Sequence, residues 1–298
     1  MFLVILMQAL FAITFPFTKL ALGYTDALFL SGARLLLASV LFLAYSYGIE
    51  KNQPSIKKHW WLLLQASIFY TFLTFVPEAL AMETISSLKS NLLWSFYPFV
   101  SALLSYYLLK ERLTKKKWLG MGIGLVGMIP IFATMDVQEQ ALGEFLHISM
   151  PEFLMVIAVV STAYSWFLIR RLMQSGFSLA RINGITMFVG GALGLGTRLL
   201  MNKGPLYHDG NMLFSYIFAL IIASNLIGYP LYGYLLKRYS ITFLSFSGFI
   251  CPIFGAVFSS LLLGETIHCA YLIGFVFIFA GLSIFSRDEL HGGISTQP

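Results

Sequence analysis

The hydrophobic positions of this 298-residue chain gather into ten long runs separated by short polar stretches. A helix needs about 20 mostly apolar residues to cross the hydrocarbon core of a bilayer, and each run approaches or exceeds that length. The runs lie at 2–23, 27–48, 60–82, 85–109, 118–134, 151–170, 179–201, 212–236, 241–263 and 269–286. This pattern predicts an all-α integral membrane protein with ten transmembrane helices.

Composition supports the same fold class, because 58% of the residues are hydrophobic and only 11% are charged. A soluble domain has about 25% charged residues, so this chain lacks the polar residues that a water-facing surface requires. The first run has no basic segment before it and no small-residue cleavage site, and we therefore interpret it as a true span. Cys251 and Cys269 fall in or beside apolar runs and are interpreted as small apolar residues.

Lysine and arginine are distributed unevenly between the two sides predicted for ten alternating helices. Fourteen of the 19 lie in the loops that follow runs 2, 4, 6 and 8 or in the C-terminal tail, whereas the opposite loops contain only Lys203. Cytoplasmic loops are the ones enriched in these residues, so both termini are predicted to be cytoplasmic. The short tails favour a bacterial inner membrane. The net charge of +6 is then a topology signal, and no nucleic-acid partner is expected.

A segment near residue 100 recurs 154 residues later without a gap. Eight of the thirty pairs between positions 98–127 and 252–281 are identical, including a proline, a glutamate and two glycines: Pro98/Pro252, Glu111/Glu265, Gly120/Gly274 and Gly127/Gly281. The first copy leads into a predicted cytoplasmic loop and the second into an external one. Five spans in each half would therefore give two halves of opposite orientation, which is a common design of secondary transporters.

Two segments, one from each half of the chain, resemble the sequences of a known family. They read "EALAMETISSLKSNLLWSFYPFVSALLSYYLLKERLTKKKWLGMGIGLVG" (78–127) and "YSITFLSFSGFICPIFGAVFSSLLLGETIHCAYLIGFVFIFAG" (239–281). The chain resembles the drug/metabolite transporter superfamily of EamA type over nearly its whole length. The resemblance implies two inverted five-helix repeats at 1–134 and 151–286, an external connecting loop at 135–150 and a cytoplasmic tail at 287–298. It also implies a central cavity lined mainly by spans 1, 3, 4, 6, 8 and 9.

Ionisable residues inside spans are expensive and are functional candidates by default. Glu78 and Lys89 flank one short hairpin loop, so an ion pair between them is expected, with either a role on the substrate route or a purely structural one. Lys19 and Arg34 are placed nearer the interface, where snorkelling explains a cation without any function.

Polar and aromatic residues mark the face that we expect to line a cavity. Asn91, Trp94, Ser95 and Pro98 share one helix face at spacings of three and four. Span 8 offers Asn225, Tyr229 and Tyr232, and span 6 offers Tyr164, Ser165 and Trp166. The predicted substrate-binding set is Glu78, Lys89, Asn91, Trp94, Tyr164, Asn225, Tyr229, Ser245, Gln8 and Phe15.

Two prolines lie near the middle of spans 4 and 9, at Pro98 and Pro252. Proline removes a backbone hydrogen bond and bends a helix. These residues are predicted to bend the inner helices around the cavity, either as points that flex during transport or as static kinks.

The residue types predict a substrate class. A carboxylate and an ammonium group suit the two ends of a zwitterion, and aromatic walls suit a flat ring or an onium centre. S-adenosylmethionine combines an amino-acid end, a sulfonium and an adenine, and some members of the resembled family carry it. It is therefore the lead substrate, in exchange for S-adenosylhomocysteine. Transport of aromatic or neutral amino acids and proton-coupled efflux of drugs or metabolites are the alternatives.

Other function classes fit the sequence less well. The chain has no G-x-x-x-x-G-K-[ST] loop for ATP and no H-E-x-x-H or clustered carboxylates for a metal, so neither an enzyme, a cofactor nor a metal site is expected. A channel would not need two inverted halves broken by proline, and a non-transport subunit would not need charges inside spans. The sequence leaves open the direction of transport, the use of a proton or a counter-substrate, and the oligomeric state.

Overall fold

The computed structural model describes residues 2–50, 53–110, 114–127, 129–130, 149–202, 210–239, 241–267 and 269–291. Four sequence features fall outside these ranges: most of the loop at 135–150, Lys203, Glu111 and the last seven residues of the tail.

Every regular element in these ranges is helical, and none is a strand. The first half of the chain forms α1 (Phe2–Ala12), α2 (Thr14–Leu22), α3 (Ala27–Ile49), α4 (Ile56–Ala66), the π-helix η1 (Ser67–Phe72), α5 (Leu73–Met82), α6 (Ser87–Trp94), α7 (Tyr97–Leu109) and α8 (Lys115–Val126). The second half forms α11 (Met150–Gln174), α12 (Leu179–Leu200), α13 (Gly210–Leu220), the π-helix η2 (Ile221–Gly228), α14 (Tyr229–Leu236), α15 (Ile241–Ser247), the 3-10 turn η3 (Gly248–Ile250), α16 (Cys251–Leu263) and α17 (Cys269–His291). Helix α17 runs past residue 286, so the first residues of the predicted tail are helical.

Six of these helices, some built from consecutive segments, are long and apolar enough to cross a membrane. They are Phe2–Leu22, Ala27–Ile49, Ile56–Met82, Met150–Gln174, Leu179–Leu200 and Gly210–Leu236. The all-α fold class is confirmed, and the apolar helices agree with an integral membrane protein.

Five of the described helices, α3, α6, α8, α11 and α12, begin at a polar side chain that the sequence supplies. Asp26, Ser86, Thr114 and Ser178 each accept a hydrogen bond from the backbone N–H three residues later. Helix α11 begins with a capping box between Ser149 and Glu152. Such caps satisfy N–H groups that have no partner inside the helix, which matters most beside an apolar phase.

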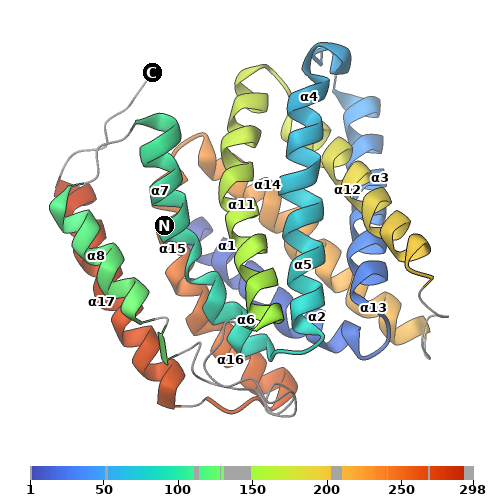
Figure 1. The fold of residues 1–298 in the computed structure, drawn as a ribbon. Coiled ribbons are helices and arrows are strands. Elements are labelled where there is room, and N and C mark those ends of the chain that lie inside the picture. The colour runs from blue at the N-terminus through green and yellow to red at the C-terminus, as the bar shows by residue number, and fades with distance from the viewer. Residues whose placement is uncertain are drawn as a thin grey trace.

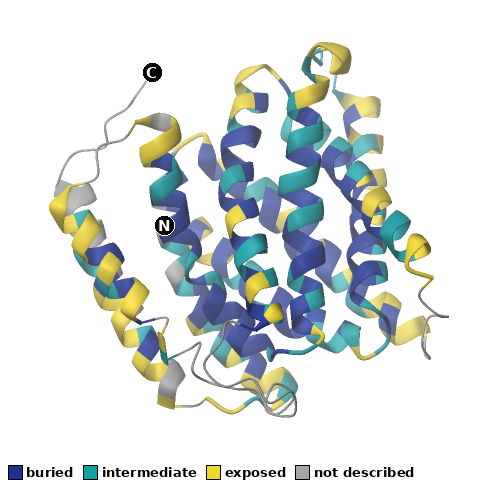
Figure 2. Ribbon diagram, in the orientation of Figure 1, coloured by how far each residue is buried: buried dark blue, intermediate teal, exposed yellow. Residues whose placement is uncertain are grey.

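The helices form one bundle with a peripheral pair. Figure 1 shows α5, α11 and α14 in the middle, α3 and α12 packed together at one edge, and α8 and α17 together at the other. Buried residues concentrate in the middle of the bundle, while α8 and α17 are largely exposed (Figure 2). Glycines allow close helix contacts: a Cβ on Gly191 would lie 2.9 Å from the carbonyl oxygen of Gly32.

Local irregularities recur with the 154-residue spacing of the sequence repeat. The π-helix η1 begins at Ser67 and η2 begins at Ile221. Left-handed backbone ends α7 at Lys110 (φ 55°) and α16 at Gly264 (φ 65°). Two interruptions, between α6 and α7 and at η3, also correspond. The repetition is thus one of backbone shape as well as of residue identity.

Pro98 and Pro252 are the second residues of α7 and α16, directly after these interruptions. The first-turn N–H groups of a helix have no partner within that helix, so proline is tolerated there. Each proline therefore begins the second part of a broken helix instead of kinking a continuous one.

Candidate functional site

A small cavity lies between α2, α3 and α5. Its polar lining comes from Thr18, Ser31, Arg34 and Glu78, and Phe75 provides an aromatic wall. The volume is about 10 Å³, which is roughly the room that one water molecule needs. The structure is therefore closed around this site.

Arg34 is the cation of the cavity, and its position differs from the interfacial one predicted from the sequence. It is 5% exposed, and its Nε and Nη2 donate to Asn225 Oδ1 (2.9 Å) and Ser224 Oγ (2.7 Å). Its guanidinium carbon lies 4.5 Å from the ring centre of Phe75. Both acceptors belong to η2, so the π-helix of the second half supplies the hydrogen bonds that make the buried guanidinium tolerable.

Glu78 lies on the same cavity but forms no ion pair with Arg34 or Lys89 in the described ranges. The expected Glu78–Lys89 pair is wrong because Lys89 has another acid beside it. Lys89 Nζ lies 3.0 Å from Glu152 Oε1, and both side chains are almost fully buried. The sequence placed Glu152 at the start of a span without assigning it a role.

An aromatic cluster adjoins the cavity through Phe75, whose ring centre lies 5.7 Å from that of Tyr229. Trp166 stacks on Tyr232 with ring centres 3.8 Å apart, and Tyr70 lies 5.1 Å from Tyr229 at right angles. The cluster draws on η1, α5, α11 and α14, so it joins the two halves. The rings fill the space between them in this closed form.

Some hydroxyls in and beside the cluster are also hydrogen bonded. Those of Tyr97 and Tyr232 lie 2.9 Å apart, and Tyr70 donates to Asn183 Oδ1 at 3.2 Å. Each pair crosses between the halves of the chain. The arrangement offers a charged end, at Arg34 and Glu78, and an aromatic end to a bound molecule.

Comparison with known proteins identifies the family. The sequence model of EamA-like transporters matches residues 1–133 and 149–287, which is most of the chain. The chain belongs to the EamA-like transporter family. The resemblance drawn from the repeated segments is thereby confirmed, and six of the described helices are long and apolar enough to cross a membrane.

Several curated relatives align along nearly the whole of this EamA-type chain. The S-adenosylmethionine/S-adenosylhomocysteine transporter of Chlamydia muridarum is 30% identical over 98% of the chain and 93% of its own length. Its counterpart in Chlamydia trachomatis serovar D is also 30% identical, over 98% and 90%. A probable amino-acid metabolite efflux pump of Salmonella typhimurium is 25% identical over 95% and 93%.

A solved crystal structure shares the fold of the EamA-type chain. It superposes with a TM-score of 0.68 at 17% identity and covers 96% of this chain and 94% of its own. At this identity the likeness concerns the fold alone.

The predicted site residues do not form one group. Glu78, Asn225 and Tyr229 meet at the cavity and the aromatic cluster. A second group lies around the interruption between α6 and α7, where Trp94 is 6.3 Å from Phe15 between ring centres and Asn91 Nδ2 lies 3.7 Å from the Cys251 sulfur.

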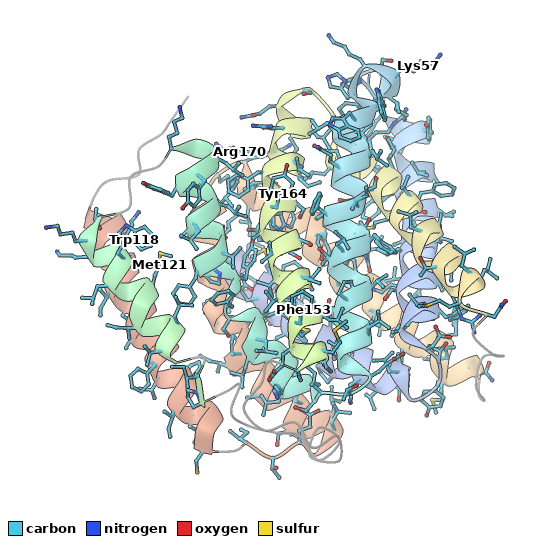
Figure 3. The ribbon with its side chains drawn as sticks, viewed as in Figure 1. Lys57, Trp118, Met121, Phe153, Tyr164 and Arg170 are labelled. Atoms are coloured by element: carbon cyan, nitrogen blue, oxygen red, sulfur yellow. The ribbon has the colours of Figure 1, made fainter. Side chains whose placement is uncertain are left out.

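Three other predicted residues contact neighbours from different helices. Gln8 donates to Ser247 Oγ at 2.8 Å, and Ser245 donates to Ser101 Oγ at 2.8 Å. These bonds join the inner helices of the two halves. Tyr164 packs against a ring of η1 instead, with ring centres 5.0 Å apart, and Figure 3 shows it midway along α11.

Three polar atoms at the α6–α7 interruption are buried without a hydrogen-bond partner in the described part of the chain: Asn91 Oδ1, Trp94 Nε1 and Ser95 Oγ. Buried polar groups are nearly always bonded to protein or water. This stretch therefore has unused capacity for water or for a polar ligand.

The end of the bundle beyond the cavity is tied by polar contacts between helices, of which those of Glu265 join the two halves. Glu265 accepts the backbone N–H groups of Ser87 (2.9 Å) and Leu88 (2.7 Å), and so caps α6. Lys19, assigned to the interface from the sequence, donates to the carbonyl oxygens of Met82 and Ile85 at 2.7 and 2.8 Å. The repeated glutamate of the second half is thus a capping residue.

Proposed function

We propose that this EamA-type transporter exchanges S-adenosylmethionine for S-adenosylhomocysteine across a bacterial inner membrane. The observation that carries the proposal is the juxtaposition of Arg34 and Glu78 on one cavity with a stacked aromatic cluster beside it. Those features match the amino-acid end and the adenine of the two compounds. Relatives that carry this substrate name align over nearly the whole chain, which supports the same choice.

The proposed architecture is ten spans in two inverted five-helix repeats, at 1–134 and 151–286. The 154-residue recurrence of π-helices and of left-handed helix ends supports a repeat. Inversion is supported by the helix directions, since α7 ends at the top of Figure 1 and α16 ends at the bottom.

The proposed topology places both termini in the cytoplasm. Lys57 at the start of α4 and Arg170 near the end of α11 lie at the same end of the bundle (Figure 3). Basic residues at one end favour its cytoplasmic placement. The Glu265 cap and the Lys89–Glu152 pair then belong to the external side, which is closed.

Transport would proceed by alternating access around the cavity. The interrupted helices α6–α7 and α15–α16 would meet near the midplane, and Pro98 and Pro252 lie in the first turn of the second part of each. Unused polar atoms lie at the α6–α7 interruption. Inverted-repeat transporters commonly place substrate beside such discontinuous helices. The site residues proposed for the route are Glu78, Arg34, Asn225, Tyr229, Trp166 and Tyr232.

A second candidate is transport of a simple amino acid or its metabolite. The 25% identical Salmonella protein, named a probable amino-acid metabolite efflux pump, favours it, and the same charged cavity would serve. Glu78 would then bind either the substrate amine or a proton.

The test is counterflow in proteoliposomes. Vesicles preloaded with unlabelled S-adenosylhomocysteine are expected to accumulate labelled S-adenosylmethionine, and vesicles without a preload are not. Accumulation of an amino acid alone would replace the substrate and keep the transporter. Uptake that follows a proton gradient without any preload would contradict exchange.

A further inference from the structure

We propose that Arg34 and Glu78 form a subsite that holds the α-carboxylate and the α-ammonium of the substrate, respectively. This inference deepens the proposed function and rests on it. It replaces Lys89, which the sequence assigned to the cationic half, with a cation that faces the cavity.

Arg34 has the capacity for an anionic ligand. A guanidinium has five N–H donors, and two of those on Arg34 bond to Asn225 and Ser224. These two bonds fix the plane of the group, while the remaining donors have no hydrogen-bond partner in the described residues. A fixed guanidinium is well suited to a carboxylate, because it can bind both oxygens in parallel.

Glu78 can accept a cationic ligand. Its carboxylate borders the same cavity as Arg34, yet no hydrogen bond or ion pair satisfies it in the described ranges. An unpaired acid inside a membrane protein is costly and is normally retained for function. A substrate ammonium would supply the missing partner, and the hydroxyls of Thr18 and Ser31 lie on the same cavity.

The rest of the substrate would extend toward the aromatic cluster. Phe75 contacts both Arg34 and Tyr229, so a molecule anchored at its amino-acid end can reach the rings past this side chain. The closed cavity holds about one water, so the anchored state requires a wider form in which Trp166 and Tyr232 separate. An adenine is a flat ring, so it could stack on Trp166 in place of Tyr232 or on Tyr232 in place of Trp166.

This assignment explains how one site accepts two different substrates. S-adenosylmethionine and S-adenosylhomocysteine share the amino-acid end and the adenosine, and they differ in the methyl group on sulfur and the positive charge that this group creates. Recognition at the shared amino-acid end does not depend on the charge on sulfur. Both compounds can therefore bind at the same site, as exchange of one for the other requires.

The experiment pairs ligand groups with side chains. Competition against labelled S-adenosylhomocysteine counterflow is measured for S-adenosylmethionine, for decarboxylated S-adenosylmethionine and for methylthioadenosine, which lacks the whole amino-acid end. Loss of the carboxylate is expected to weaken competition at least about tenfold, in the range of a hydrogen bond between charged groups. Loss of the amino-acid end is expected to weaken it further.

Variants locate the effect. Arg34→Gln should weaken competition by S-adenosylmethionine about tenfold or more and leave competition by the decarboxylated compound nearly unchanged. Glu78→Gln should weaken competition by both compounds. Arg34→Lys should recover part of the affinity, and monodispersity in detergent reports folding. Glu83→Gln and Arg198→Gln are matched controls, because Glu83 is exposed and caps Ala27 and Arg198 pairs with Asp26.

Equal competition by the compounds with and without the carboxylate would overturn the subsite while leaving the exchanger intact. An equal effect of Arg34→Gln on both would show that the residue acts only on the fold. If the parent does not carry S-adenosylmethionine, the proposed function fails, and the same variants are tested on the amino acid that drives counterflow. Insensitivity of that amino acid to both substitutions would also overturn the subsite.

Discussion

Two acid–base pairs lie in the interior of the described part of this chain, and they differ in whether the partners touch. Lys89 and Glu152 join α6 to α11 in direct contact at 3.0 Å, with side chains 1% and 2% exposed. Arg34 and Glu78 border a cavity without forming an ion pair in the described ranges. The first pair is in direct contact, whereas the second leaves a gap between its members, which we propose that the substrate fills.

We propose that the difference separates structural charge from functional charge. A buried charge is tolerable when a partner compensates it, so Lys89–Glu152 can serve as a fixed tie between the halves. A gap between opposite charges leaves interaction energy unrealised, and a zwitterion would realise it. Proximity in the chain did not separate these cases, since Glu78 is nearer to Lys89 in sequence than to Arg34.

Removing one member of the contacting pair should have the largest effect. Lys89→Met leaves Glu152 buried without its cation, and loss of one partner of a buried pair costs about 3–5 kcal/mol. We expect a large fall in thermal stability in detergent and in yield.

The double variant Lys89→Met/Glu152→Gln is the control. It removes both charges, and Gln can still accept the N–H of Ser149 that Glu152 binds at 2.8 Å. Most of the stability should return. Full stability of Lys89→Met alone would contradict a structural role for the pair.

Glu78→Gln should reverse the pattern and lose transport without losing the fold. The change leaves no hydrogen-bond or ion-pair partner of Glu78 stranded in the described ranges, so the free energy of unfolding is expected to change by less than about 1 kcal/mol. Counterflow should fall at least about tenfold. Thermal unfolding in detergent and vesicle uptake are measured on the same preparation, and a collapse in stability would place Glu78 with the structural pair.

The sequence predicted the helices well because hydrophobic runs and polar caps are local signals. The runs at 27–48 and 179–201 agree with α3 and α12 to within a residue. The run at 85–109 contains the interruption between α6 and α7, which no local hydrophobic pattern marks. The repeat was visible because its identities include rare residue types such as Pro252.

The sequence predicted the site only in part because its partners come from distant segments. Arg34 was placed at the interface by counting along its own helix, but its acceptors, Ser224 and Asn225, are on η2. The "SMPE" pattern from Ser149 to Glu152 marked a helix start, yet it held no information about Lys89. Asn225 and Tyr229 were found because an amide and an aromatic residue share one helix face.

Trp166→Leu should have an intermediate effect that depends on the ligand. The stacked contact with Tyr232 and the place proposed for adenine are both lost, and an aromatic pair contributes about 0.5–1.5 kcal/mol beyond its buried area. In competition against labelled S-adenosylmethionine counterflow, the apparent affinity of S-adenosylhomocysteine should fall roughly 2- to 10-fold. The apparent affinity of methionine, which has no adenine, should stay unchanged. Parallel weakening of both would mean that the ring supports the fold and does not read the substrate.

Arg198→Gln should have the smallest effect and calibrates the comparison of the two interior pairs. Arg198 contacts Asp26 at 2.7 Å, but the side chains are 14% and 19% exposed, so water compensates much of the lost interaction. Exposed or partly exposed ion pairs contribute about 0–1 kcal/mol, and Asp26 still accepts the N–H of Phe29 as the cap of α3. Thermal unfolding should shift little and counterflow should be unchanged. A loss of thermal stability as large as that of Lys89→Met would mean that burial does not determine how much each ion pair stabilises the fold. The distinction between contacting and separated charges would then need another basis.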